Sequence, residues 1–232
     1  YMQTVFPWRF YIDSLGFAGG SSPYPFYEFL KIKPTSFFDD DFESLQKYTV
    51  VEGKSKFDQP PAVGGCYLDA KDYILFPCQI PHDETIKHHS NVTVEQALIE
   101  TLESTASIGK RLIVKGHPEN PGSMLPLKEI CAKYKHAIWV DNANIHDMIR
   151  GAKVVVVVNS GTGMEALLHL KPVITFGRCE YDVVTMNAGL GGELRTMLTL
   201  PHFDFNNVKT FFNRWCDWTY NTREVTSFQK LG

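Results

Sequence analysis

Five consecutive valines, Val154 to Val158, run directly into the polar turn Asn159-Ser160-Gly161-Thr162-Gly163. A continuous β-branched run cannot alternate between a buried and an exposed face, so it suits a strand covered by helices on both sides. The turn then lies at the carboxyl end of a central parallel strand, where ligands bind in open α/β sheets and where the next helix offers free N–H groups to an anion. The stretch predicts either a phosphate or carboxylate site or a simple tight turn, because Thr162 and Glu165 also have capping-box spacing.

The chain from residue 71 to 200 repeats this pattern. Short apolar runs alternate with segments of helical periodicity, which is typical of βαβ units. The predicted strands lie at 73–80, 111–118, 137–141, 154–160 and 172–177. Thr93 with Gln96, Pro126 and Asn144 are start signals for the three intervening helices. We therefore predict an α/β fold with a Rossmann-like parallel sheet domain over residues 71–200.

The two ends of the chain differ from this middle part. Residues 1–70 are rich in aromatics, glycine and proline and predict a small amino-terminal lobe. Because the chain starts at Tyr1 instead of a methionine, the sequence is consistent with a fragment. Residues 201–232 predict helices that pack back on the lobes, with Trp215 and Trp218 on an apolar helix face.

Composition excludes several classes of protein. The net charge of −3 gives no indication of a nucleic-acid partner. The five cysteines are scattered without CxxC spacing, which favours free thiols in a reducing compartment over disulfides or zinc. No apolar stretch has the length of a membrane span and no signal peptide is visible, so we expect a cytoplasmic protein.

The uncommon polar motifs follow the predicted strands. They occupy residues 79–84, 115–118, 159–163 and 177–178. Because the carboxyl ends of parallel strands share one edge of a sheet, these motifs are expected to converge. That arrangement predicts a nucleotide cleft at a topological switch point.

Three of these stretches, "FPCQIPHDETI", "VKGHPEN" and "NSGTGMEALLHLKPVITFGRCEY", make the chain recognisable. Between about Asp13 and Tyr181 it resembles the bacterial capsular polysaccharide synthesis family that includes the retaining β-Kdo transferases, Kdo being an acidic eight-carbon sugar. The resemblance implies a GT-B fold, with an acceptor-side amino-terminal lobe and a carboxyl-terminal lobe that holds a CMP-sugar. Gly161 stands where relatives often carry a second hydroxyl residue.

Breaking the bond between an anomeric carbon and phosphate requires donors for the departing phosphate, and these need not include a metal. We expect His117 to stabilise the leaving group, with Lys115 adding charge and Pro118 fixing the loop. A surface loop histidine is the alternative. The turn would contribute further phosphate and nucleotide contacts from Asn159, Ser160, Gly161, Thr162 and Gly163. Glu165 suits either the ribose hydroxyls or the capping box.

Retention through a covalent adduct requires a carboxylate nucleophile. Asp83 is the candidate that matches the family pattern, unless it only caps the following loop, and His82 could keep it ionised. Asp13, in a glycine-serine context, is the candidate base for the acceptor hydroxyl. Gln79, Ser21 and Ser22 are candidate substrate-binding residues, although helix capping is favoured for the two serines.

A metal site at His82, His88, His89 and Asp83 is disfavoured, since adjacent histidines diverge on regular structure. We therefore expect no cofactor beyond the donor substrate. The expected partners are a nucleotide sugar and a glycan or glycolipid acceptor, with peripheral association at the inner membrane or a capsule complex. The alternatives are a transferase or epimerase acting on another nucleotide sugar, and a non-catalytic capsule-assembly or export module.

Overall fold

A six-stranded parallel sheet forms the larger part of the protein in this computed structural model, which describes residues 2–21, 40–63, 72–189 and 193–223. The strand order is β5-β4-β3-β6-β7-β8 and every pair in it is parallel. The strands are β3 (Tyr73–Pro77), β4 (Leu112–Lys115), β5 (Ala137–Val140), β6 (Ala152–Val157), β7 (Val173–Thr175) and β8 (Met186–Asn187). The first five confirm the predicted strands, whereas β8 was not predicted. This order is that of a Rossmann fold, with the switch point between β3 and β6.

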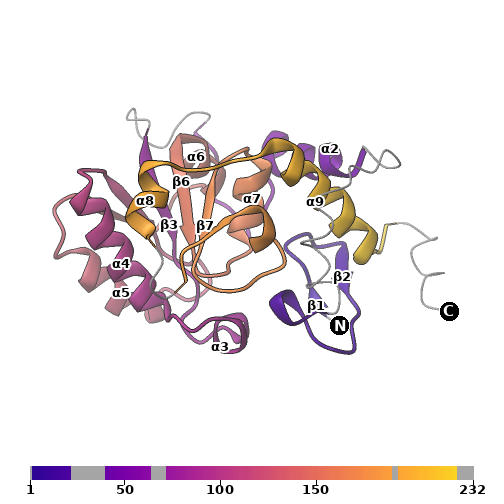
Figure 1. The fold of residues 1–232 in the computed structure, drawn as a ribbon, viewed down its shortest axis with the longest axis horizontal. Helices are drawn as coiled ribbons and strands as arrows, with labels where there is room; N and C mark the ends of the chain where they lie inside the picture. Colours follow the sequence, from indigo (N-terminus) through magenta and orange to yellow (C-terminus); the bar gives the residue numbers. More distant parts are fainter. Residues whose placement is uncertain (1, 22–39, 64–71, 190–192, 224–232) are drawn as a thin grey trace.

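The valine run lies in the middle of the sheet, as its lack of alternation predicts. Val155 and Val157 of β6 pack into one core cluster, together with residues of α6 (Ile145–Gly151) and α7 (Thr162–Leu168). Val154 and Val156 face the opposite cluster, formed with α4 (Val94–Ser107), α5 (Leu125–Cys131) and α8 (Leu194–Thr199). Figure 1 shows α4, α5 and α8 on one side of the sheet and α7 on the other.

The helix start signals are mostly confirmed. Thr93 and Gln96 form a complete capping box, Pro126 lies in the first turn of α5, and Asn144 caps α6 by accepting from the His146 N–H. The proposed capping box of α7 is wrong. Gly161, which has no side chain, occupies the N-cap in place of Thr162, and the Glu165 carboxyl hydrogen-bonds Ser55.

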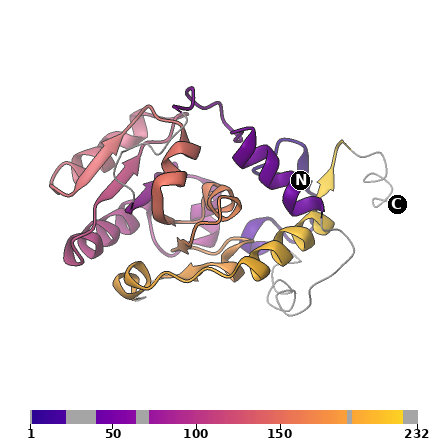
Figure 2. The same ribbon diagram turned by 90° about the horizontal axis from the view of Figure 1, so that it is seen from above.

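The second, smaller lobe joins both ends of the described chain (Figures 1 and 2). Its antiparallel sheet has the order β1-β2-β9. Helices α2 and α9 lie side by side, and both contact β2, α9 through Trp215 and α2 through Asp41. The elements of this lobe are β1 (Met2–Gln3), β2 (Arg9–Tyr11), η1 (Ala18–Gly20), α2 (Asp40–Gln46), the π-helical turn η2 (Lys47–Val51), α9 (Phe205–Trp218) and β9 (Tyr220–Asn221). The predicted boundary between residues 70 and 71 lies outside the described residues and stays a prediction.

Of the two tryptophans predicted on an apolar face of α9, only Trp215 is buried. Trp215 is fully buried and donates its indole N–H to the Tyr11 hydroxyl, whereas Trp218 is 43% exposed. A spacing of three residues turns the two side chains about 60° apart around the helix, and Trp218 falls at its carboxyl end. Within the described ranges, no helix combines the length and apolarity needed to cross a bilayer.

Candidate functional site

A cavity of about 410 Å³ opens at the carboxyl ends of β3, β4 and β6, at the predicted switch point. Ten predicted site residues line it: Gln79, Asp83, Lys115, His117, Pro118, Asn159, Ser160, Gly161, Thr162 and Glu165. The other walls come from Met2–Val5 and Phe17 of the small lobe and from the segment between Ser55 and Gln59. The strand-end motifs therefore converge as their positions in the sequence predict.

The floor of the cavity carries a buried cation. Lys115 ends β4 with only 5% of its surface exposed, and its ammonium donates to the Gly116 carbonyl at 3.3 Å. Burial lowers the pKa of Lys115, while Cys78 and the carboxyl groups of Asp141 and Glu165 oppose that shift. A desolvated ammonium of this kind is suited to an anionic ligand group.

His117 presents one ring nitrogen as a donor. Its Nδ1 accepts from the Glu119 backbone N–H at 3.2 Å, so the neutral ring carries its proton on Nε2. Burial and the Lys115 charge lower the pKa of His117, which keeps the imidazole neutral near pH 7. The ring meets Phe57 edge to face at 5.3 Å. It is therefore a half-buried group of the cavity wall, as predicted in preference to a surface histidine.

Glu165 lies one turn inside α7 with 7% of its surface exposed. Burial raises its pKa to about 7, although the Ser55 hydroxyl and the Lys115 charge act in the opposite direction. The carboxyl group is thus poised between its two protonation states at neutral pH.

The glycines of the turn make room for protein side chains. A Cβ at Gly161 would overlap Val5, and one at Gly163 would overlap the ring of Tyr181. The Gly163 N–H donates to the Ser160 carbonyl at 2.9 Å, and the Tyr181 hydroxyl donates to the same oxygen. The Gly163 N–H is therefore already bonded within the turn. This packing also accounts for a glycine at 161 in place of a hydroxyl residue.

Gln79 and Asn159 hold the strand ends together. The Gln79 amide donates to Asn159 Oδ1 at 2.9 Å and to the Thr85 hydroxyl at 2.8 Å. The Asn159 amide in turn donates to the Thr85 carbonyl at 2.8 Å. Because both amides are bonded within the protein, their contribution to the site is to fix β3, β6 and α3 (Glu84–His89) relative to one another.

Asp83 occupies a place that suits both of its predicted roles, the helix cap and the carboxylate of the cavity. It is the N-cap of α3, accepting from the Thr85 N–H at 2.8 Å and from the Thr85 hydroxyl, and it also lines the cavity. The carboxylate is therefore held in a fixed orientation at the cavity wall.

Three predicted residues, Asp13, Ser21 and Gly163, are not among the described residues that line the cavity. Asp13 accepts from the Leu15 N–H at 2.8 Å, and neither it nor Ser21 belongs to the described cavity wall. Ser21 is buried and donates its hydroxyl to the Ala18 carbonyl at the end of η1, in agreement with the capping alternative. Ser22 lies outside the described residues.

The histidines near α3 have separate surroundings. His88 contacts Glu84 at 3.1 Å, and the His89 ring packs against Phe17 at 5.2 Å. Across the described ranges, no group of three or more His, Cys, Asp or Glu side chains is arranged to hold a metal ion. Four cysteines, Cys78, Cys131, Cys179 and Cys216, are buried free thiols there, and Cys66 lies outside.

Sequence reasoning missed the walls that come from distant parts of the chain. Ser55, Phe57 and Val5 carry no motif and are far in sequence from the strand ends. The aromatic and glycine-rich texture of the amino-terminal segment predicted a small lobe, but none of these contacts with the cavity.

Comparison with known proteins places this site in a family. The family model described as "Capsule polysaccharide biosynthesis protein" matches residues 67–192, more than half of the chain. Capsule polysaccharide export protein KpsS of Escherichia coli is 31% identical over 121 residues, covering 48% of this chain and 31% of that protein. Capsule polysaccharide modification protein LipB of Neisseria meningitidis serogroup A is 25% identical over 122 residues, 29% of its length. The chain thus aligns with about a third of these curated relatives.

Solved structures of low sequence identity share the fold. The β-Kdo 2,7 transferase of Thermosulfurimonas dismutans KpsC aligns with a TM-score of 0.56 at 20% identity, covering 88% of this chain and 64% of that one. The β-Kdo 2,4 transferase of the same protein gives 0.53 at 16% identity, covering 91% and 68%. The fold is therefore GT-B-like, and the chain belongs to the capsule polysaccharide biosynthesis protein family.

Proposed function

We propose that this protein binds a CMP-sugar in the cavity between its lobes and transfers the sugar, Kdo or a related acidic sugar, to a capsule or surface-polysaccharide acceptor. The observation that carries the proposal is the convergence of Lys115, His117 and Glu165 at the switch point of a GT-B-like fold. Two cationic or N–H donors and a carboxyl group lining the same cavity match a nucleoside monophosphate, which has an anionic phosphate and a ribose diol.

The proposed roles follow from these positions. The Lys115 ammonium and the His117 Nε2–H stabilise the phosphate as it departs. Glu165 accepts hydrogen bonds from the ribose hydroxyls. Asp83, oriented by its bonds to Thr85, attacks the anomeric carbon, and a covalent adduct resolved by the acceptor would retain configuration. An enzyme that acts on this class of acceptor would be located in the cytoplasm, at the inner face of the inner membrane.

The first test is ligand-induced thermal stabilisation by CMP, UDP and GDP. Selective stabilisation by CMP is expected, because a ligand that binds only the folded state raises the unfolding temperature. Indifference to all three nucleotides would reject the proposal. Selective binding of UDP would point to the transferase or epimerase that uses another nucleotide sugar.

A matched pair of variants localises the binding. Lys115→Met removes the buried ammonium and is expected to weaken CMP binding roughly tenfold to a hundredfold, the worth of a charged hydrogen bond. Its unfolding free energy should stay the same or rise, since a buried charge is costly. The control Lys128→Met removes an exposed ammonium paired with Asp141 and should leave CMP affinity unchanged. Equal affinity of Lys115→Met and the parent would place the nucleotide elsewhere.

A non-catalytic capsule-assembly or export role is the second candidate. It is favoured by one observation, that the Asp83 carboxylate is already engaged as the N-cap of α3. Such a protein would bind glycan yet release no sugar from the donor. Incubation with CMP-Kdo and detection of free CMP separates the two candidates.

A further inference from the structure

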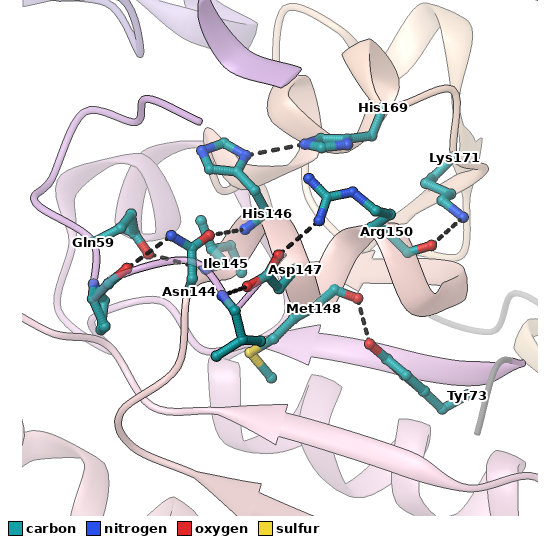
Figure 3. Close-up of polar contacts among 12 residues, drawn as sticks. Gln59, Tyr73, Asn144, Ile145, His146, Asp147, Met148, Arg150, His169 and Lys171 are labelled. Atoms are coloured by element: carbon teal, nitrogen blue, oxygen red, sulfur yellow. Dashed lines mark hydrogen bonds and ion pairs between the residues drawn. The ribbon is translucent and has the colours of Figure 1, made fainter. Parts of the chain in front are cut away.

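A chain of partly buried hydrogen bonds leads from the cavity to the far end of α7. The Ser55 hydroxyl bonds the Glu165 carboxyl, and Ser55 Oγ lies 3.0 Å from His146 Nε2. His146 Nδ1 lies 3.0 Å from His169 Nε2, the contact drawn in Figure 3. The proposed transfer reaction assigns no role to Ser55, His146 or His169.

The protons of this chain have a consistent direction. The Ser55 hydroxyl has a single proton, and because its bond lowers the pKa of Glu165, it donates that proton to the carboxylate. With His146 Nδ1 facing His169, the Ser55 oxygen accepts from His146 Nε2–H and its own proton is directed at Glu165. The cavity carboxyl therefore receives a donor from behind while its open side faces the ligand.

The charged groups around the chain support this direction. Burial lowers the pKa of His146 to about 4 and that of His169 to about 3, so both rings are neutral at pH 7. The Arg150 charge lowers both pKa values further, and the Lys171 charge lowers that of His169. The Asp147 charge raises the pKa of His146 and so opposes the shift. Lys115 and Tyr48 are further titratable groups that interact with Glu165. Neutral imidazoles relay hydrogen bonds without adding charge beside the carboxyl group.

Ser55 is held in place by the segment that follows it. The Asn144 amide donates to the Pro60 carbonyl at 2.8 Å, and the Ile145 N–H donates to Gln59 Oε1 at 3.1 Å (Figure 3). The Val63 N–H donates to Asp147 Oδ2 at 2.7 Å. These bonds attach residues 59–63 to the start of α6, which also carries His146.

We propose that Ser55 and His146 are positioning residues, which hold the Glu165 carboxylate as the acceptor for the ribose of the bound nucleotide. This inference rests on the proposed function, since it assumes that a nucleotide occupies the cavity. Its consequence is that the chain, through Ser55, sets the pH at which the carboxylate becomes available. Ionised Glu165 accepts two hydroxyl protons, so nucleotide affinity should rise with pH as this group ionises.

The experiment measures CMP affinity by calorimetric titration between pH 5.5 and 8.5. The parent is expected to gain affinity with a midpoint near pH 7. Ser55→Ala removes a donor to the carboxylate and should move the midpoint up by about half a pH unit to one unit. Ser55→Thr keeps the hydroxyl and should restore the parent profile.

The control is Thr105→Val, which removes another hydroxyl bonded to an imidazole, that of His136 at 2.9 Å, from α4 on the opposite face of the sheet. Its profile should match the parent. A Ser55→Ala profile that also matches the parent would overturn the inference.

A second measurement is independent of the nucleotide. Infrared difference titration of the free protein follows the protonated carboxyl band that Glu165→Gln removes. If the parent binds no CMP, the proposed function fails, while an unshifted Glu165 titration in Ser55→Ala still rejects the role of the chain.

Discussion

Single buried side chains make the stability of this protein depend on pH in two opposite directions. Burial raises the pKa of Glu165 to about 7, so between about pH 4.3 and 7 the folded protein holds a proton that the unfolded chain has released. The stability contributed by this group is complete below pH 4.3 and is lost as the pH rises to 7. His146 and His169, with lowered pKa values, act oppositely, because their contribution is lost as the pH falls below about 6.5.

Glu165→Gln tests the first of these contributions. The unfolding free energy of the variant, relative to the parent, should increase by about 1.4 kcal/mol per pH unit between pH 5 and 6.5, because the parent alone loses stability there through this group. Urea denaturation at several pH values provides the measurement. For Glu129→Gln, an exposed substitution on α5, the plot of unfolding free energy against pH should run parallel to that of the parent. If the plot for Glu165→Gln also runs parallel to that of the parent, the raised pKa of Glu165 is contradicted.

At the scale of single elements, local signals predicted local structure well. The capping box of α4, the proline of α5 and the asparagine cap of α6 all depend on neighbouring residues, and all three are confirmed. The capping box of α7 is wrong for the opposite reason. Glu165 finds its partner in Ser55, 110 positions earlier in the chain, and no local pattern contains that contact.

The start of α3 carries a prediction that separates structure from chemistry. Asn caps a helix about as well as Asp, so Asp83→Asn should fold like the parent and yet abolish sugar transfer, because an amide cannot attack the anomeric carbon. Asp83→Ala should also lose about 1 kcal/mol of unfolding free energy. Denaturation together with a transfer assay using CMP-Kdo distinguishes the two effects. Full transfer by Asp83→Asn would exclude Asp83 as the nucleophile.

For the whole molecule, the sequence predicted one lobe far better than the other. The parallel sheet follows from apolar runs of the right length, and its polar edge follows from parallel strand direction alone. The small lobe depends on pairings between distant segments, such as β2 with β9, and on contacts of Val5 with Gly161. Those contacts depend on the complementary shapes of side chains that are distant in the sequence. Hydrophobic periodicity therefore cannot predict them.

The contact between the lobes can be tested by a double mutant. Gly161 has φ −54°, which alanine tolerates, so the cost of Gly161→Ala should come from its overlap with Val5. We expect a loss of about 1–3 kcal/mol in unfolding free energy, as for other overpacked sites. In a Val5→Ala background the same substitution should be neutral or stabilising. Additive effects of the two changes would show that the contact is not the cause.

The pairing of β2 with β9 also has a consequence for how the protein is made on the ribosome. Arg9 lies opposite Asn221, so the small lobe cannot close until more than two hundred further residues have been translated. The parallel sheet needs only residues 73–187 and can fold before then. Until β9 arrives, β2 lacks one of its two partner strands, and β2 is the strand that pairs with β1 at the cavity wall. Ligand binding is therefore expected to appear late in synthesis, as a discrete step after the larger lobe has already formed.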